Sequence, residues 1–162
     1  MGRSRGRSVV LIVKVETLRA ACCVAGVDGE ISDAEERLLR ELKETAGVGE
    51  ASFRAMKDMA VTERAYYERL FVMLEPDPEQ VLTQLGLVAA ADGEISSHEE
   101  RVLRHFAEKL SFGEERTEAL IRSMNERAGR VTPEDLQAEQ LPDGPALPTP
   151  ASTPPIDRPD RA

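Results

Sequence analysis

The sequence predicts an all-α domain of seven helices, formed by two three-helix repeats around a central apolar helix. The first observation is an internal repeat: VDGEISDAEERLLRELKE, from Val27 to Glu44, returns 64 positions later as ADGEISSHEERVLRHFAE, from Ala91 to Glu108. Secondly, aromatic residues make up only 4% of the chain and Trp is absent, so an aliphatic core of packed helices is favoured over a sheet sandwich. Thirdly, apolar residues recur at helical spacing on both sides of each DGEIS stretch.

The first repeat, about residues 9–60, should contain three helices. Val9 to about Val27 carries apolar residues at helical spacing. Ser32 then begins the second helix as its N-cap, and Glu35 three residues later completes a capping box. The third helix should cover about residues 50–60. Its predicted buried side chains are Phe53, Met56 and Met59.

A central helix is predicted over about residues 62–75. The run from Leu70 to Leu74 would make this helix apolar on nearly all sides. Such a pattern is typical of a helix that is buried in the middle of a domain.

The second repeat, about residues 77–127, should again contain three helices. Pro78 suits the first position of its first helix. Ser96 and Glu99 form the second predicted capping box. The last helix should run from Glu114 to about Arg127, at the same offset as the third helix of the first repeat.

The predicted helical domain covers residues 9–128, and two segments lie outside it. Residues 1–8 contain three arginines and no acidic residue, which predicts a basic flexible arm. Residues 129–162 contain eight of the chain's ten prolines and few large apolar residues. Such a segment cannot offset its ordering entropy by burial, so a disordered acidic tail is predicted, with at most one helical turn at Thr132–Leu136.

Composition narrows the function. The net charge of −9 argues against nucleic-acid binding, since phosphate contacts need a basic face. The apolar run Val9–Val13 ends at Lys14, too short for a signal sequence or a membrane span. Cys22 and Cys23 are adjacent in an apolar stretch and are interpreted as core residues. We therefore expect a cytoplasmic protein that does not insert directly into a membrane, although a membrane-bound partner could recruit it.

The DGEIS stretch has the residues of a helix-to-helix turn. Gly29 and Gly93 allow a positive φ where the preceding helix ends. Asp28 and Asp92 follow a helix C-terminus, where the helix dipole disfavours a carboxylate. Each aspartate should therefore either accept N–H bonds within the turn or bind a cation.

Glu35 and Glu99 lie on the same helical stripe as the apolar residues that follow them. A buried carboxylate is costly unless it is paired, hydrogen-bonded or neutralised. The first interpretation is structural, because each glutamate can accept the backbone N–H of its own N-cap serine.

The second interpretation is a metal site. The pattern D-G-x-I-S-x-x-E matches the second half of a calcium-binding EF-hand loop. A complete EF-hand is excluded, because its leading ligand positions fall on residues without side-chain oxygens: Val24, Gly26, Val88 and Ala90. A site shared between the repeats remains, for Ca²⁺, Mg²⁺, Zn²⁺ or Mn²⁺. Its candidate ligands are Asp28, Glu35, Asp92 and Glu99, with His98 as an additional one.

These paired motifs resemble the tellurite-resistance TerB family, a domain type also found at the N-terminus of some membrane-linked DnaJ co-chaperones. The resemblance covers about residues 9–127. It rests on Val24-Ala25-x-x-Asp28-Gly29-Glu30-Ile31-Ser32-x-x-Glu35 and Val88-Ala89-x-x-Asp92-Gly93-Glu94-Ile95-Ser96-x-x-Glu99. It implies a compact helical, non-enzymatic module, associated with metal or tellurite stress and with divalent cations. No H-P-D motif of a J-domain occurs in the chain.

Three functions follow as hypotheses. The first is a TerB-like stress module that acts through protein partners and binds a divalent cation. The second is a structural interaction domain whose acidic loops only cap helices. The third is an enzyme that uses inward-facing carboxylates as general acid and base. No catalytic motif supports the third, so a non-enzymatic protein is expected.

Overall fold

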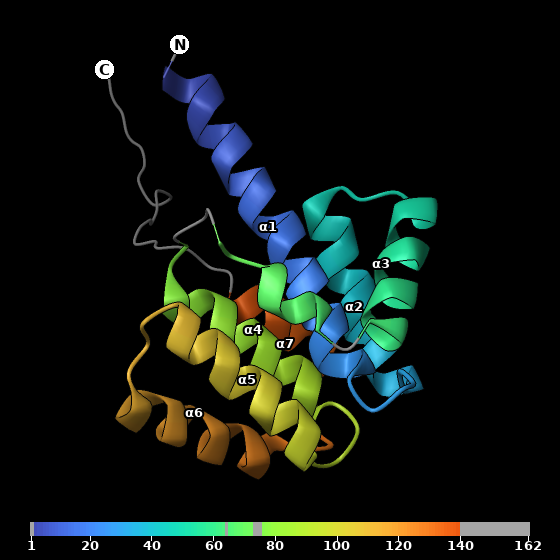
Figure 1. Ribbon diagram of the computed structural model, residues 1–162, viewed down its shortest axis with the longest axis vertical. Coiled ribbons are helices and arrows are strands. Elements are labelled where there is room, and N and C mark those ends of the chain that lie inside the picture. The colour runs from blue at the N-terminus through green and yellow to red at the C-terminus, as the bar shows by residue number, and fades with distance from the viewer. Residues whose placement is uncertain (1, 64, 73–75, 140–162) are drawn as a thin grey trace, which may run out of the picture.

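The computed structural model describes the backbone of residues 2–63, 65–72 and 76–139, and side chains from residue 11 to residue 136 within those ranges. All regular structure in this part of the chain is helical, which confirms the predicted all-α class. Figure 1 shows the arrangement. The elements are α1 (Gly2–Gly26), α2 (Asp33–Ala46), α3 (Glu50–Thr62), the 3₁₀ turn η1 (Tyr66–Arg69), α4 (Pro78–Ala90), α5 (Ser97–Lys109), α6 (Glu114–Arg127) and α7 (Pro133–Glu139).

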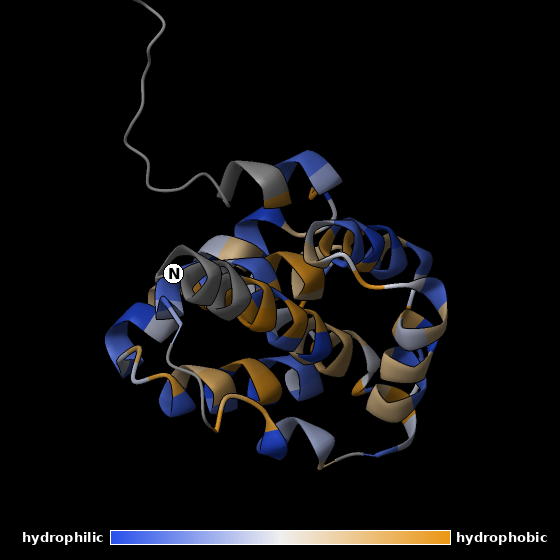
Figure 2. Cartoon of the chain, turned by 90° about the horizontal axis from the view of Figure 1, so that it is seen from above, coloured by the Kyte–Doolittle hydropathy of each residue, from blue (hydrophilic) through white to orange (hydrophobic). Residues whose placement is uncertain are grey.

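The second half of α1 and nearly all of α4 supply the centre of the core. From Thr17 to Ala25, every residue of α1 except Arg19 is buried. Helix α4 contacts α1, α2, α5, α6 and α7, and apolar residues gather toward the interior in Figure 2. The buried residues of α4 are Val81, Leu82, Gln84, Leu85, Gly86, Leu87, Val88, Ala89 and Ala90. Burial on all sides explains why α4 lacks a polar face.

The predicted central helix over residues 62–75 is wrong for the part that the structure describes. Only Tyr66–Arg69 is helical there beyond the end of α3, as a single 3₁₀ turn. Phe71 has a φ of 59°, in the left-handed region, where a right-handed helix cannot continue. Its N–H donates to the Glu16 carboxylate of α1 at 3.0 Å. Phe71 is buried while Val72 is 63% exposed, so the apolar run is not buried on all sides.

The prediction of a flexible arm over residues 1–8 is corrected over the described residues, because α1 begins at Gly2. The first turns of this helix extend away from the other helices (Figure 1). Extension of an existing helix adds one hydrogen bond for each residue that it orders, so the packed half of α1 can propagate toward the N-terminus.

The predicted tail also begins too early. Helix α7, Pro133–Glu139, packs against α2 and α4, and its Leu136 is fully buried. Thr132 starts the helix, because its N–H donates to the Asp135 carboxylate at 2.8 Å. Proline at the first helical position needs no N–H partner. The folded part therefore extends to residue 139, and the remainder of the predicted tail, residues 140–162, lies outside the described residues.

Other predictions about the core can be compared with the structure directly. Burial of Phe53 and Met56 is confirmed, whereas Met59 is 39% exposed, contrary to the prediction. Cys22 and Cys23 are buried with free thiols, as expected for core residues. None of the described helices combines the length and the apolar character needed to cross a membrane.

Candidate cation site between the two acidic loops

Both predicted capping boxes are present at the loops that precede α2 and α5. The Ser32 hydroxyl accepts the Glu35 N–H at 3.1 Å, and Glu35 Oε1 accepts the Ser32 N–H at 2.9 Å. Ser96 and Glu99 repeat this pair of bonds at 3.1 and 2.9 Å. Each glutamate is thereby held at the third position of its helix with its carboxylate at the helix N-terminus, where the dipole favours negative charge.

The two capping glutamates are buried, as their place on the apolar stripe predicts. Each side chain belongs to a residue that is only 2% exposed. The capping bond uses Oε1 of each carboxylate and leaves Oε2 for another partner. Glu35 Oε2 is buried and, when both glutamates are ionised, has no hydrogen-bond donor among the described residues. Among these residues, a protonated Glu99 is the one neighbour that donates to it. Such an atom normally has a partner, because an unsatisfied buried carboxylate oxygen costs free energy.

Three of the four predicted ligands come together. One carboxylate oxygen each of Glu35, Asp92 and Glu99 lies within 4.8 Å of the others. Glu35 comes from the first repeat, and the other two come from the second. The packing of α1 against α2 and α4, and of α4 against α5, brings the two loops to the same end of the core. The site is therefore shared between the repeats.

The three carboxylates strongly affect one another's ionisation. Burial, the neighbouring Glu35 carboxyl and the charge of Asp92 raise the pKa of Glu99 to about 9. Burial and Asp92 also raise the pKa of Glu35, while a hydrogen bond with Glu99 opposes that rise. The physical cause is that two buried like charges are costly, so the pair retains one proton and shares it. A cation could replace that proton.

Asp28, the fourth predicted ligand, lies outside this trio. Its carboxylate accepts a hydrogen bond from the Ser96 hydroxyl at 3.0 Å and contacts His98 Nδ1 at 2.9 Å. His98 is thus a partner of Asp28 and does not belong to the set of three converging side chains. The counterpart of His98 in the first repeat is Ala34, which cannot hold Asp92 in the same way. This difference leaves Asp92 for the trio.

The Asp28 contact with Ser96 and His98 is the feature that sequence reasoning missed. The repeat identified both aspartates as candidate ligands, of which Asp92 alone joins the glutamates. The unmatched His98 was the available signal that the surroundings of the two aspartates differ. Spacing along a helix cannot reveal a contact across 68 or 70 positions. Comparisons with known proteins add no assignment: no family model matches the chain, and neither a curated protein nor a solved structure matches it.

Proposed function

We propose that this chain is a non-enzymatic helical module that binds one hard divalent cation between its two acidic loops. The ligands are Glu35, Asp92 and Glu99. The observation that carries the proposal is Glu35 Oε2, a buried carboxylate oxygen in a group of three converging carboxylates. Among the described residues it has a hydrogen-bond donor only when Glu99 holds a proton. A cation would satisfy this atom and offset the repulsion that otherwise keeps a proton on the pair.

The ligand set indicates the class of cation. All three ligands are carboxylates, with no nitrogen or sulfur donor in the group. Such oxygen donors suit Mg²⁺, Mn²⁺ and Ca²⁺, whereas Zn²⁺ sites in proteins are mostly completed by His or Cys. Each glutamate offers one oxygen, since the other is bound in a capping box. Water must therefore complete the coordination shell, which favours Mg²⁺ or Mn²⁺ over Ca²⁺ with its six to eight oxygen ligands.

Isothermal titration calorimetry tests this proposal. We expect saturable binding of Mg²⁺ or Mn²⁺ to the full chain at a ratio of one, with weaker binding of Zn²⁺. The double variant Glu35→Gln/Glu99→Gln should lose at least about tenfold in affinity, because charged ligand atoms are replaced by neutral ones. Glutamine also serves in capping boxes, so the variant should keep its helix starts.

A matched control is available in the same loops. Glu30→Gln/Glu94→Gln removes two exposed acidic residues at corresponding positions and changes the net charge by the same amount. This control should bind the cation as the unmodified chain does. Absence of saturable binding by the unmodified chain would rule the proposal out. Equal losses of cation affinity in both double variants would indicate general charge attraction instead of binding at a defined site.

One observation favours a second function, a structural interaction domain without metal. Both capping boxes are complete, so each glutamate already stabilises its helix start. An N-cap bond is worth about 1 kcal/mol. A chain that binds no cation, yet loses stability in Glu35→Ala or Glu99→Ala, would have this second function.

The wider role is proposed from the TerB resemblance alone. On that basis the protein is a cytoplasmic stress-related module, linked to tellurite or metals, that works through protein partners. The resemblance also implies two pseudo-twofold three-helix repeats, an arrangement supported by the 64-residue offset between the two capping boxes.

A further inference from the structure

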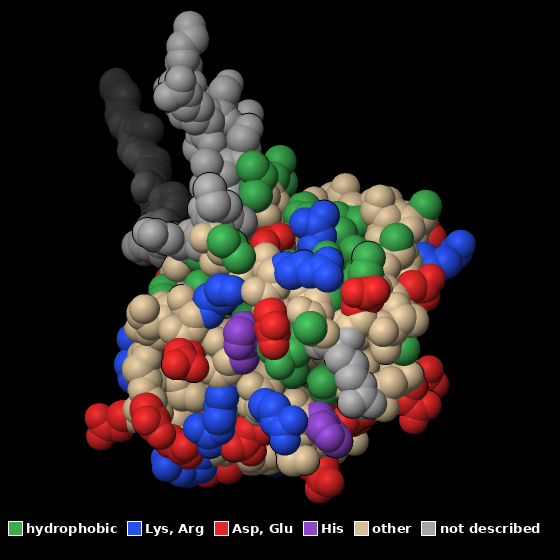
Figure 3. All heavy atoms as spheres, viewed as in Figure 1, with side chains coloured by type: hydrophobic (Ala, Val, Ile, Leu, Met, Phe, Trp, Pro, Cys, Tyr) green, Lys and Arg blue, Asp and Glu red, His purple; other side chains and the backbone are tan. Residues whose placement is uncertain are grey.

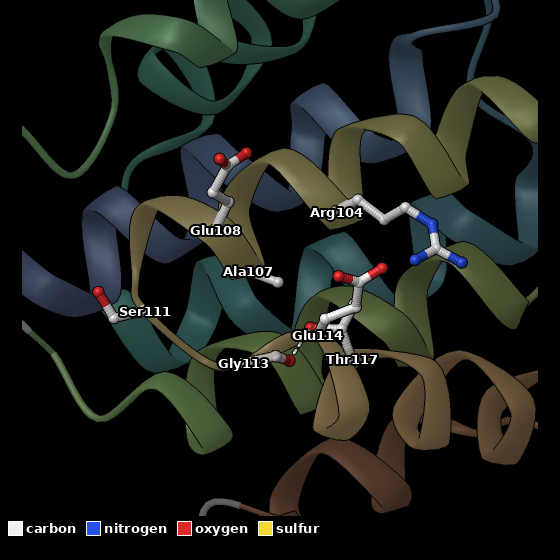
Figure 4. Close-up of a pocket in the computed structure, with 7 residues that line it drawn as sticks. All are labelled: Arg104, Ala107, Glu108, Ser111, Gly113, Glu114 and Thr117. Carbon is white, nitrogen blue, oxygen red and sulfur yellow. Dashed lines mark hydrogen bonds between the residues drawn. The ribbon is translucent and has the colours of Figure 1, made fainter.

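A pocket of about 510 Å³ opens between α5 and α6, away from the acidic loops (Figure 4). Its volume is within the range of ligand pockets in proteins. Glu114 points from the first turn of α6 toward α5, as Figure 4 shows. The lining residues are Arg104, Ala107, Glu108, Ser111, Gly113, Glu114 and Thr117.

The first repeat has larger side chains at two of the positions that correspond to the pocket lining. The residues 64 positions earlier are Arg40, Lys43, Glu44, Gly47, Gly49, Glu50 and Phe53. Two large side chains of the first repeat are thus replaced by small ones: Lys43 corresponds to Ala107, and Phe53 corresponds to Thr117. Phe53 is fully buried and Lys43 is 8% exposed. Ala107 and Thr117 are themselves only 3% and 5% exposed, so they form the floor of the pocket.

Lys43 also provides a charge that the second repeat lacks. Its Nζ lies 3.3 Å from the Glu44 carboxylate and 3.8 Å from that of Glu50. Glu50 in addition accepts from Arg40 at 3.0 Å. A carboxylate at this position of the first repeat is therefore paired with both an ammonium and a guanidinium group.

Glu114, the counterpart of Glu50, has lost both partners. Alanine stands at position 107, and Arg104 is engaged elsewhere, at 2.7 Å from each of Glu100 and Glu118. The cause of the second loss is residue 118, a glutamate where the first repeat has Arg54. Among the ion pairs of the described residues, none includes Glu114 or Glu108.

The second repeat does not refill the space with another residue. Phe112 is larger than its counterpart Val48, but it does not line the pocket, and the Arg116 guanidinium covers its ring at 4.2 Å. The Thr117 hydroxyl donates to the Gly113 carbonyl at 2.7 Å, so it is satisfied within α6. Compared with the first repeat, the pocket therefore lacks an ammonium group on an alkyl chain, which Lys43 provides there.

We propose that the pocket between α5 and α6 binds the side chain of a lysine presented by a partner protein. The ammonium group pairs with Glu114, and with Glu108 at the rim, as Lys43 pairs with Glu50 and Glu44. The alkyl chain lies over Ala107 and Thr117. Arg104 does not repel the ligand, because Glu100 and Glu118 neutralise it, and the five charged groups together carry a net negative charge.

A lysine within a protein fits the site better than a free amine. Glu108 and Glu114 are exposed, so the mouth of the pocket is open to solvent. A small amine would bury little surface there, whereas a partner would also place its backbone against α5 and α6. On the face seen in Figure 3, basic side chains are interspersed with acidic ones. The whole chain nevertheless carries a net charge of −9, so a control at a neighbouring exposed glutamate must separate attraction to the pocket from attraction to the overall charge.

NMR titration of the ¹⁵N-labelled full chain tests the proposal. The probe is a five-residue peptide with a central lysine flanked by alanines, capped at both ends. Saturable shifts are expected at the Ser111, Gly113 and Thr117 amides. The same peptide with an acetylated lysine should produce none of them. Butylammonium should bind at least about fivefold more weakly, because it lacks the flanking backbone. Equal affinity for butylammonium would overturn the assignment to a protein lysine.

Three variants complete the test. Glu114→Gln should weaken peptide binding about tenfold, as loss of one charged partner implies. Ala107→Lys should abolish binding, because it restores the lysine of the first repeat inside the pocket. Glu115→Gln, at a neighbouring exposed position, should have no effect. Peptide binding unchanged in Glu114→Gln, or equal losses in Glu114→Gln and Glu115→Gln, would overturn the proposal even if Ala107→Lys did not fold.

Discussion

The cation-free protein should lose stability as the pH rises from about 5 to about 8, by roughly 1 kcal/mol for each pH unit. The cause is the Glu35–Glu99 pair. The pKa of Glu99 is raised to about 9 in the folded state, chiefly by burial, so the folded protein keeps a proton that the unfolded chain releases above its ordinary pKa of about 4.5. This contribution is fully present below the unfolded pKa and disappears as the pH passes through the folded one. Urea unfolding with a chelator present measures it.

The variant Glu99→Gln isolates this effect. The neutral amide keeps the capping box and can donate to Glu35 Oε2 without ionising. We expect the variant to be more stable than the unmodified chain at about pH 8 by roughly 1–3 kcal/mol, because the unmodified chain must take up a proton on Glu99 when it folds at this pH, whereas glutamine is neutral in both states. A variant that is no more stable at this pH, with an unchanged pH slope, would contradict the assignment of the slope to this pair.

Three other titratable side chains define the conditions for this comparison. Burial lowers the pKa of His105, so its contribution to stability rises with pH near neutrality and opposes that of the glutamates. Burial raises the pKa of the Cys22 and Cys23 thiols, to about 12 for Cys23, and both would add a loss of stability in alkali. The contributions of these three groups cancel when the unfolding free energy of Glu99→Gln is subtracted from that of the unmodified chain at each pH below about 8.

Truncation of Leu136 to alanine should cost about 2–5 kcal/mol of folding free energy. Leu136 is fully buried, and its helix α7 packs against α2 and α4. A leucine in a disordered tail would instead be replaced without measurable cost. Chemical unfolding monitored by circular dichroism distinguishes these outcomes.

The exposed residue Glu134 offers a control on the same helix. Glu134→Ala should change the unfolding free energy by no more than about 0.5 kcal/mol, as is usual for surface substitutions. Equal and small effects of Leu136→Ala and Glu134→Ala would show that α7 contributes nothing to the stability of the domain.

Much of the fold could be predicted because its signals are local. Capping boxes at Ser32 and Ser96 depend on residues three positions apart, and both are present. For the end helix the sequence predicted at most one turn, at Thr132–Leu136, because proline-rich composition outweighed one leucine, Leu136. The burial of this leucine depends on packing against the distant helices α2 and α4. The central helix predicted over residues 62–75 was wrong for a similar reason. Glu16, which is distant in the sequence, holds Phe71 in a conformation that a helix cannot continue through.

The sequence by itself determined the repeat, the helix starts and the glutamates that lie inward, because helix caps and helical periodicity are short-range properties. Only the tertiary structure decided which carboxylates meet. Three of the four predicted ligands converge, and Asp28 turns instead to Ser96 and His98. The physical reason is that two copies of one loop acquire different neighbours when they pack together, so a single difference such as Ala34 and His98 gives equivalent aspartates different partners.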